Sequence, residues 1–385
     1  MKNSNKLRVF EAFSGIGAQR KALERLGINH EVVAISEIDK FAIKSYEAVH
    51  GKTLNLGDIS KLKVEDIPDH DLFTCSFPCQ SISISGLQRG FEEGSGTRSS
   101  LLWECKRVIE GKKPKYILME NVKNLVSKKF KPTFDKWCEW LEGQGYTNYW
   151  QVLNAKDYGV PQNRERVFMI SILGVHEPYV FPEKQELHIR LKDVLEKEVD
   201  SKFYVKEEKI AQFLKNVDGK IDLSKKRLGT LHKNNDMQHS TRSIVFNDNF
   251  ESLCLTATMC KDAPKVMVSE RLFGLFDKED KKNQAGGVYN KDKLSPTLST
   301  MQGGWQQPLI IDDESMITIR KLTPKECWRL MGFDDSDFEK AEQVNSNTQL
   351  YKQAGNSIVV NCLEGIFYEL FKNTEYMEVE SENVA

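Results

Sequence analysis

The chain is constrained most by Phe77-Pro78-Cys79-Gln80, because an apolar run before it, residues 71–76, predicts a buried strand. A cysteine at the carboxyl end of a parallel strand lies where open α/β sheets place their chemistry. Pro78 cannot continue a hydrogen-bonded ladder, so the chain must turn there and expose the thiol. A lone free cysteine is more often a small buried hydrophobic residue. The prediction of a reactive thiol therefore depends on the motifs around it.

Short apolar runs alternate with helix-like segments through the first half of the chain, which is typical of a mostly parallel α/β sheet. The predicted strands are residues 7–12, 32–36, 72–75, 116–119 and 167–172, and the predicted helices are 17–27, 40–50, 101–111 and 133–144. In this arrangement Cys75 would end a strand and point into the sheet. Cys79 would lie beyond the strand end.

The alternation stops near Pro182, and no regular pattern follows until about residue 315. It resumes where Thr323 can cap a helix whose first position is Pro324. A last helix after Gly355 has its apolar residues on one face. These breaks predict a catalytic domain at 1–182, a second domain at 183–315 with short strands at 295–298 and 303–304, a segment at 316–372 that completes the first domain, and a disordered tail at 373–385.

Composition describes a globular chain of 385 residues, with 39% hydrophobic and 29% charged residues, long enough for two domains. No apolar stretch approaches the roughly 18 residues that would span a bilayer. The first residues have no apolar core, so we expect no signal peptide and a cytoplasmic protein. The eight cysteines form no Cys-x-x-Cys pair, and His176 and His188 have no cysteines at ligand spacing. We expect neither a metal site nor disulfides.

The formal net charge of −1 does not favour a nucleic-acid partner. Charge is averaged over all faces, however, and binding needs only a local patch. Residues 223–247 carry five basic side chains against one acidic side chain, a local balance of +4. This stretch could be a solvated loop or a contact surface for phosphates.

Residues 13–17 lie between a predicted strand and a predicted helix, where Gly15 and Gly17 permit a tight turn and close approach of a ligand. Twenty residues later, Glu37 ends the next strand, where a carboxylate can accept from both ribose hydroxyls. Arg20 stands where a dinucleotide-binding turn needs a small residue, so the pattern favours a nucleoside without a pyrophosphate. Asp58 could accept from an adenine amino group, or could simply cap a short helix over 59–62.

Further motifs follow in a fixed order: residues 120–122 (Glu-Asn-Val), 162–166 (Gln-Asn-Arg-Glu-Arg) and 353–357 (Gln-Ala-Gly-Asn-Ser). Together with 13–17 and 77–80 they resemble the DNA cytosine-5 methyltransferase family, in its prokaryotic or phage modification type. The resemblance covers 1–182 and 316–372, and covers 183–315 only by position and a Thr-Leu pair. It implies a Rossmann-like α/β fold, a mixed sheet with helices on both faces, and a smaller, irregular target-recognition domain.

The family reaction moves a methyl group from S-adenosylmethionine to C5 of a flipped cytosine, leaving S-adenosylhomocysteine and using no metal. A thiolate must add to the neighbouring C6, with a pKa lowered by its surroundings. By resemblance the catalytic residues are Cys79, Glu120, Arg164 and Arg166. Glu120 would donate a proton at N3, which requires a raised pKa, and Asn121 would fix the loop. The two arginines would share a strand face and grip the base, a phosphate or the loop.

The resemblance also assigns binding residues. The cofactor-binding positions are Phe13, Ser14, Gly15, Ile16, Gly17, Glu37, Ile38, Asp58, Ile59, Pro78, Leu101, Asn356 and Ser357. The DNA-binding positions are Gln80, Ser83, Ser85, Arg98, Gln162, Lys225, Lys226, Arg227, Thr297 and Leu298. The segment between Cys79 and Leu101 looks like the mobile loop that closes over DNA, although residues 92–98 are longer than the family pattern.

The implied partner is double-stranded DNA. The resemblance also implies a monomeric, nucleoid-associated enzyme with no membrane partner. A cognate restriction endonuclease could act separately on the same DNA. Three alternatives remain. A tRNA cytosine-5 methyltransferase would use the same chemistry. An NAD-dependent oxidoreductase would explain Glu37 but not Cys79 or Glu120. A non-catalytic DNA-binding module would explain only the basic stretch.

Overall fold

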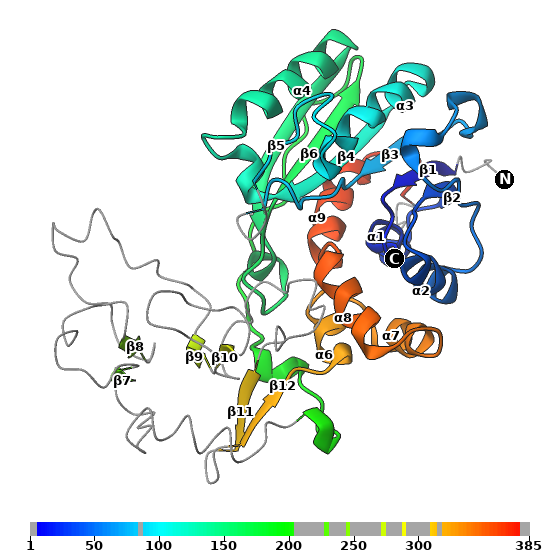
Figure 1. Cartoon of the computed structure of the whole chain (residues 1–385). Helices are drawn as coiled ribbons and strands as arrows, with labels where there is room; N and C mark the ends of the chain where they lie inside the picture. Colours follow the sequence, from blue (N-terminus) through cyan, green and yellow to red (C-terminus); the bar gives the residue numbers. More distant parts are fainter. Residues whose placement is uncertain are drawn as a thin grey trace, which may run out of the picture.

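A computed structural model describes residues 6–83, 88–203, 227–230, 244–246, 271–274, 287–289, 309–313 and 318–377 (Figure 1). Its main sheet has six strands in the order β2-β1-β3-β4-β6-β5. Their bounds are β1 Leu7–Ala12, β2 His30–Ser36, β3 Leu72–Cys75, β4 Tyr116–Val122, β5 Tyr146–Asn154 and β6 Glu165–Leu173. Strands β1 to β4 run parallel, and β6 is antiparallel to both β4 and β5. The predicted α/β class with a mixed sheet is confirmed.

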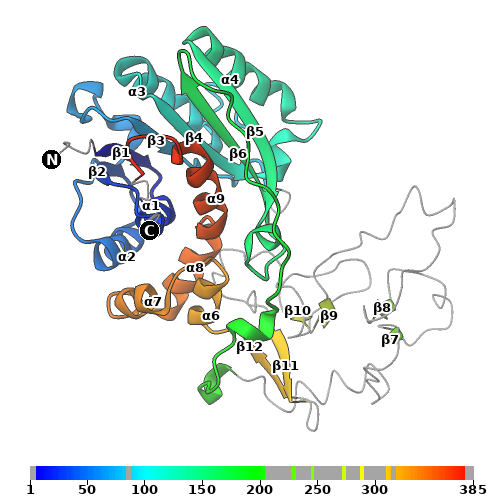
Figure 2. The ribbon, with the colours of Figure 1, turned by 180° about the vertical axis from the view of Figure 1, so that it is seen from behind.

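Helices cover both faces of this sheet, because successive strand residues point to opposite sides. Val9 faces the core under α1 (Ala18–Arg25) and α9 (Val360–Phe371), whereas Phe10 faces the core under α3 (Cys105–Lys112) and α4 (Lys131–Gly143). Figures 1 and 2 show the two helix pairs on opposite sides of the sheet. Helix α9 packs beside α1, so the C-terminal helix contributes to the core under these two helices. Its apolar residues are buried there, as their spacing along the sequence predicts.

The remaining helices follow β2 or belong to the segment after residue 321. They are α2 (Lys40–His50), α6 (Pro324–Arg329), α7 (Asp335–Glu342) and α8 (Asn347–Asn356), with 3₁₀ turns that include η1 (Ile59–Lys61), η3 (Arg98–Glu104) and η5 (Ala155–Tyr158). Thr323 and Glu326 form a capping box at the start of α6, which confirms the predicted cap. Lys21 on α1 pairs with Asp337 on α7 at 2.8 Å and ties this segment to the sheet domain.

Several elements differ from the sequence prediction. Strand β5 was missed because it is the sheet edge and its exposed positions do not alternate cleanly. Helices α7 and α8 were also missed, since both are short and polar. The helix predicted over 101–111 begins as the 3₁₀ turn η3 and continues as α3.

The predicted disordered tail needs a correction over residues 373–377. The Tyr376 carbonyl accepts a hydrogen bond from the Asn29 amide at 3.0 Å, and its ring packs edge-on against Phe371. Tyr376 and Met377 therefore pack against the core that contains the buried residues of α1 and α9. Residues 378–385 lie outside the described residues.

Within residues 183–315 the structure describes only short pieces of chain beyond residue 203. Strands β7 (Arg227–Thr230) and β8 (Ile244–Phe246) form one ladder. A four-stranded sheet has the order β12-β11-β10-β9, with bounds β9 Arg271–Gly274, β10 Gly287–Tyr289, β11 Leu309–Asp313 and β12 Thr318–Lys321. The short strands predicted at 295–298 and 303–304 lie outside the described residues, and the division into domains stays a prediction.

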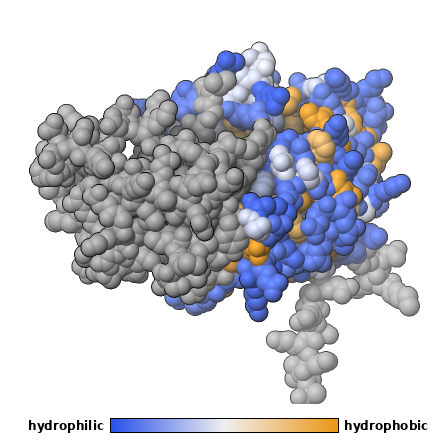
Figure 3. Space-filling view, turned by 60° about the horizontal axis from the view of Figure 1, so that its bottom comes forward, coloured by the Kyte–Doolittle hydropathy of each residue, from blue (hydrophilic) through white to orange (hydrophobic). Residues whose placement is uncertain are grey.

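The described surface shown in Figure 3 is mainly hydrophilic, with hydrophobic residues scattered singly or in small groups. No helix in the described part of the chain is long and apolar enough to cross a membrane. Among the same residues, no three His, Cys, Asp or Glu side chains are grouped so as to hold a metal ion.

Candidate active site

The loop between β1 and α1 adopts a left-handed backbone at three positions: Phe13, Gly15 and Gly17 have φ angles of 56°, 57° and 79°. Only glycine adopts such angles at little cost. Gly17 also has no room for a side chain, because a Cβ there would lie 2.6 Å from Nε2 of His50. Ser14 is buried in this loop, and its Oγ has no hydrogen-bond partner in the described structure.

Glu37 follows β2 and faces this loop. Its Oε2 accepts the amide proton of Gly15 at 3.0 Å, and its Oε1 accepts those of Ile38 and Asp39, each at 2.8 Å. Asn55 holds the turn from behind, since its Oδ1 accepts from the Glu37 amide at 3.2 Å and its Nδ2 donates to the Glu37 carbonyl at 3.0 Å. Asn55 is a positioning residue that sequence reasoning missed. Its only signal is its place two residues before Gly57.

The structure shows the cap at Asp58 that was one of the two interpretations of this residue. Its carboxylate accepts from the amide and hydroxyl of Ser60 at the start of η1, and the hydroxyl bond is the main reason why its pKa is lowered. Capping occupies Oδ1. The side chain remains half-buried. A role toward a nucleoside stays a prediction.

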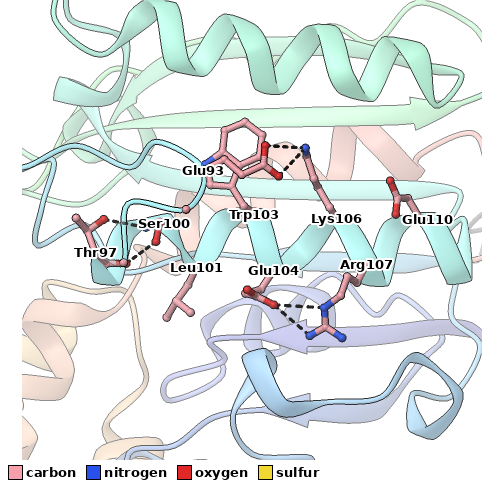
Figure 4. A pocket seen from close by; sticks show the side chains of 11 residues that line it. Glu93, Thr97, Ser100, Leu101, Trp103, Glu104, Lys106, Arg107 and Glu110 are labelled. Carbon is pink, nitrogen blue, oxygen red and sulfur yellow. Dashed lines mark hydrogen bonds and ion pairs between the residues drawn. The ribbon is translucent and has the colours of Figure 1, made fainter.

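Two apolar side chains near these polar groups, those of Ile38 and Leu101, are exposed to solvent to different degrees. Ile38 is 72% exposed, although it is a large hydrophobic residue directly after Glu37. Leu101 lies half-buried on η3 and borders a pocket of about 640 Å³. Figure 4 shows that the side chains of Leu101, Glu104 and Arg107 project from one side of η3 and the adjoining helix α3, while those of Trp103 and Lys106 project from the other side. Arg107 donates to the Ile59 carbonyl at 3.0 Å, which joins η1 to α3 beside Leu101.

The C-terminal residues Asn356 and Ser357 end α8. One turn earlier, Gln353 is 5% exposed, accepts from Ser45 Oγ at 3.0 Å and donates to the Phe41 carbonyl at 3.0 Å. Both partners lie on α2, directly after Glu37. The predicted cofactor positions from the two ends of the chain are therefore brought to neighbouring elements.

The structure separates the two cysteines near the strand end. Cys75 is fully buried at the end of β3, whereas Cys79 lies beyond it and is partly accessible. Buried side chains hold the intervening turn: Asn121 donates to the Phe77 carbonyl at 2.9 Å, and Ser99 donates to the Pro78 carbonyl at 2.6 Å. The expectation that Asn121 fixes this loop is confirmed. Ser99, which is fully buried, was not identified from the sequence.

Glu120 on β4 and Arg166 on β6 form an ion pair of 3.2 Å, and both lie close enough to Cys79 for their charges to act on its thiol. Burial raises the pKa of Glu120, against the opposing charges of Arg166 and Arg164, as a proton donor requires. Burial also raises the pKa of Cys79, while Arg166 lowers it. The expected lowering of the thiol pKa is therefore wrong for this structure, because desolvation of the thiolate outweighs the attraction of the guanidinium.

Arg164 contacts the C-terminal segment in this structure, and its predicted grip on the base, a phosphate or the loop stays a prediction. It is 4% exposed and donates to the carbonyls of Gly355 and Ser357 at 3.0 and 2.7 Å. Burial lowers the pKa of this guanidinium to about 9, so it stays charged at neutral pH. Arg164 lies just before β6 and joins the C-terminal segment to the site, which leaves Arg166 as the arginine paired with Glu120.

The predicted DNA contacts have mixed outcomes. Gln80 and Arg98 are exposed and joined by a hydrogen bond of 3.2 Å, and Ser83 is half-buried. Gln162 is fully buried and donates to the Leu330 carbonyl at 2.7 Å, so in this structure it contacts the C-terminal segment, and its role toward DNA stays a prediction. The other predicted contacts lie outside the described residues or, for Arg227, have a side chain outside them: Ser85, Lys225, Lys226, Arg227, Thr297 and Leu298.

Replacing Arg166 by glutamine is expected to slow alkylation of Cys79 by iodoacetamide at neutral pH. The thiolate is the reactive form, and loss of the guanidinium removes the charge that lowers the pKa of Cys79. Each pKa unit gained would slow the reaction by up to about tenfold. The measurement is the rate of Cys79 alkylation against pH, with Lys123→Gln, at an exposed pair with Glu165, as the control. An unchanged pH profile would contradict the electrostatic role of Arg166.

Comparison with known proteins agrees with this geometry. The model of the family described as C-5 cytosine-specific DNA methylase matches residues 7–372. The chain is 38% identical to the type II methyltransferase M2.ScrFI of Lactococcus lactis subsp. cremoris, over 95% of this chain and 99% of that protein. It is 34% identical to the orphan methyltransferase M.SPBetaI of Bacillus phage SPbeta, over 98% and 100%.

Solved structures show the same fold at lower identity. The Dnmt2 methyltransferase of S. pombe has a TM-score of 0.61 and 20% identity, over 95% of this chain and 99% of that one. A putative DNA modification methyltransferase from an E. coli prophage has a TM-score of 0.59, also at 20% identity, over 95% and 99%. With the match of the family model over nearly the whole chain, the protein belongs to the C-5 cytosine-specific DNA methylase family.

Proposed function

We propose that the residues at the carboxyl edge of β3 and β4 carry out the family reaction in this chain, with Cys79 as the nucleophile. The reaction is methylation of cytosine at C5 in DNA. The observation that carries this assignment is the shared environment of three groups. Arg166 pairs with Glu120 at 3.2 Å, and both act electrostatically on the thiol of Cys79.

The cofactor of the family is S-adenosylmethionine, which when bound supplies an electrophilic methyl group on a sulfonium. The residues of the loop between β1 and α1, and those at the end of β2, fit such a molecule. Glu37 offers carboxylate oxygens beside Gly15 for ribose hydroxyls, and the exposed side chain of Ile38 offers an apolar surface for a base. The buried, unpartnered Oγ of Ser14 is a further polar group in this loop.

In the proposed mechanism, the Cys79 thiolate attacks C6 of an extruded cytosine and forms an S–C6 bond, which makes C5 nucleophilic. Electron density moves toward N3 in this step, where protonated Glu120 shares its proton. Arg166 holds the Glu120 carboxyl in place and stabilises the thiolate. After methylation, the C5 proton passes to solvent, the electrons of the C5–H bond restore the C5–C6 double bond, and the S–C6 bond breaks to release Cys79 as a thiolate, while the proton shared at N3 returns to Glu120.

Labelled methyl transfer tests this function against its alternatives. The purified chain is expected to move tritiated methyl from S-adenosylmethionine to double-stranded DNA and not to tRNA. Transfer to tRNA alone would favour the tRNA methyltransferase. Binding of DNA without any transfer would favour a non-catalytic module.

Replacing Glu37 by alanine is expected to weaken binding of S-adenosylmethionine and to leave DNA binding nearly unchanged. Hydrogen bonds to a charged acceptor contribute roughly 1.5–3 kcal/mol, which is about ten- to a hundredfold in affinity. Calorimetric titration measures this loss. Glu37→Gln keeps one acceptor for the backbone amides of the turn, and Glu31→Ala, on an exposed position of β2, serves as the control. Unchanged cofactor affinity in Glu37→Ala would make this residue purely structural.

We infer that residues 184–315 read the target sequence, because the flipped cytosine is the same for every target and the catalytic pocket carries no information on flanking bases. Grafting this segment from a relative with another target is expected to transfer the target, measured by bisulfite sequencing. An active chimera that kept the original target would contradict the assignment.

Neutralising Lys225, Lys226 and Arg227 together should weaken binding to all DNA sequences and reduce the salt dependence of binding by up to about three units of slope.

A further inference from the structure

His50 lies between two hydrogen-bond acceptors, one of which belongs to residues 13–17, called here the cofactor loop. It is the last residue of α2, and its side chain is fully buried. Its Nε2 lies 3.2 Å from the carbonyl oxygen of Ile16, and its Nδ1 lies 3.1 Å from Oε1 of Glu24. A neutral imidazole carries a proton on only one nitrogen, so either tautomer would turn a ring lone pair toward an acceptor. Only a ring protonated on both nitrogens satisfies both contacts.

The groups around the ring also favour a cation at this place. Burial by itself would raise the pKa of Glu24, but the hydrogen bond and charge of His50, together with Arg20, bring that pKa down to about 2. The C-terminal end of a helix attracts positive charge. Opposing charge comes from Arg20, whose Nε donates to the same Glu24 oxygen at 3.1 Å.

Three further titratable groups lie around His50: Tyr46 on α2 itself, Glu11 on β1 and His30 on β2. Tyr46 on α2 tilts against the His50 ring, with 4.9 Å between ring centroids, and donates to Oε2 of Glu11 on β1 at 2.8 Å. Burial raises the pKa of Glu11, whose Oε1 has no partner in the described structure. His30 on β2 lies near enough to His50 for their charges to interact, but its Nδ1 contacts the Ile28 carbonyl.

The contact of His50 with Ile16 acts on the cofactor loop itself. Ile16 lies between Gly15 and Gly17, and the ring fills the space that a Cβ at Gly17 would need. The position of the ring is in turn fixed by Arg20, whose Nη2 donates to the His50 carbonyl at 2.9 Å. The loop is thus supported from below through a side chain that touches neither of the expected reactants.

We propose that His50 is a positioning residue for residues 13–17, and that in its doubly protonated form it joins the Ile16 carbonyl to Glu24 and holds the loop in the shape that binds the cofactor. Loss of the proton from either ring nitrogen breaks one of the two contacts, so deprotonation of the ring is expected to weaken cofactor binding. This inference rests on the proposed role of these loop residues in binding S-adenosylmethionine.

Binding of S-adenosylhomocysteine tests the proposal without any turnover. Calorimetric titration of the full chain between about pH 5.5 and 9 covers the range in which histidines titrate. The unaltered protein is expected to bind about tenfold more weakly at the alkaline end, since a charge-assisted contact is lost. His50→Gln should bind weakly at every pH with a flat profile. His30→Gln, a histidine in the same region without a loop contact, should keep the profile of the unaltered protein.

Glu24→Gln gives the sharper comparison and keeps the test valid if His50→Gln does not fold. Its amide oxygen can still accept from Arg20, while its amide nitrogen can donate to a neutral His50 ring. This variant is expected to retain its affinity and to lose most of its pH dependence. Ring nitrogen shifts in a ¹⁵N-histidine NMR spectrum should show both His50 nitrogens protonated at about pH 6 in the unaltered protein.

The outcomes separate this proposal from the function on which it rests. If the unaltered protein does not bind S-adenosylhomocysteine, the proposed cofactor site fails and this inference fails with it. If it binds with the same pH profile as His50→Gln, or if Glu24→Gln keeps the full pH dependence, only the role of His50 is overturned.

Discussion

Replacing Cys79 by alanine is expected to abolish methyl transfer while binding of S-adenosylmethionine and DNA survives. The thiolate forms the bond to C6 and no other group in the described site can replace it, so less than about a hundredth of the rate should remain. Binding should survive because the Pro78 turn is held by Ser99 and Asn121, through backbone carbonyls that the substitution leaves intact. Methyl transfer and calorimetric binding, measured on the same preparation, test both statements.

Cys75→Ala is the matched control, since this thiol lies four residues earlier and is fully buried in the sheet. A trapping experiment accompanies this control: 5-fluorocytosine at the target holds the covalent adduct, because fluorine cannot leave as a proton does. The adduct should map to the peptide that contains Cys79. An adduct on Cys75, or a Cys79→Ala enzyme with more than about a hundredth of the activity, would overturn the assignment.

Replacing Glu120 by glutamine is expected to lower turnover by about 10²- to 10⁴-fold, the range that general acids contribute, with little loss of binding. Glutamine can still donate a hydrogen bond to N3, but it cannot share a proton as the electron density moves there. Burial raises the pKa of Glu120 and so favours its protonated form. Single-turnover kinetics at saturating DNA separate this chemical step from binding.

The pH dependence gives a second check on Glu120. A carboxyl that acts as a proton donor is active below its raised pKa and loses activity as the pH rises through it. The single-turnover rate of the unaltered enzyme should therefore fall with rising pH, and the rate of Glu120→Gln should not show this fall. Glu165→Gln, at a half-buried position of the neighbouring strand β6, is the control and should behave like the unaltered enzyme. A Glu120→Gln variant with normal turnover would remove this residue from the mechanism.

Local sequence was enough for the elements that carry the site. The predicted strands at 7–12 and 72–75 match β1 and β3 to the residue, since short apolar runs bounded by Gly and Pro leave few other solutions. The positive φ angles of Gly15 and Gly17 follow from the same local rules. Strand β5 was missed because an edge strand is stabilised by its neighbour β6 more than by any pattern of its own.

Side-chain environment, by contrast, depended on contacts between distant segments. The sequence could place Arg164 and Arg166 near the site, but not tell them apart. Residues 355 and 357 bury Arg164 through their carbonyls, and Glu120 on another strand pairs with Arg166. The predicted lowering of the Cys79 pKa was wrong for the same reason. Burial raises this pKa, and the degree of desolvation depends on all the residues packed around the thiol.

The sequence by itself determined the order of the motifs, the turn that exposes Cys79 and the class of the sheet, because turn chemistry and apolar periodicity act within a few residues. Only the tertiary structure decided which polar groups meet. It placed Asn55 behind Glu37, Ser99 against the Pro78 carbonyl, and His50 between Ile16 and Glu24. Such pairs join segments that are far apart in the chain, and their hydrogen bonds and charges depend on a packing that no local pattern encodes.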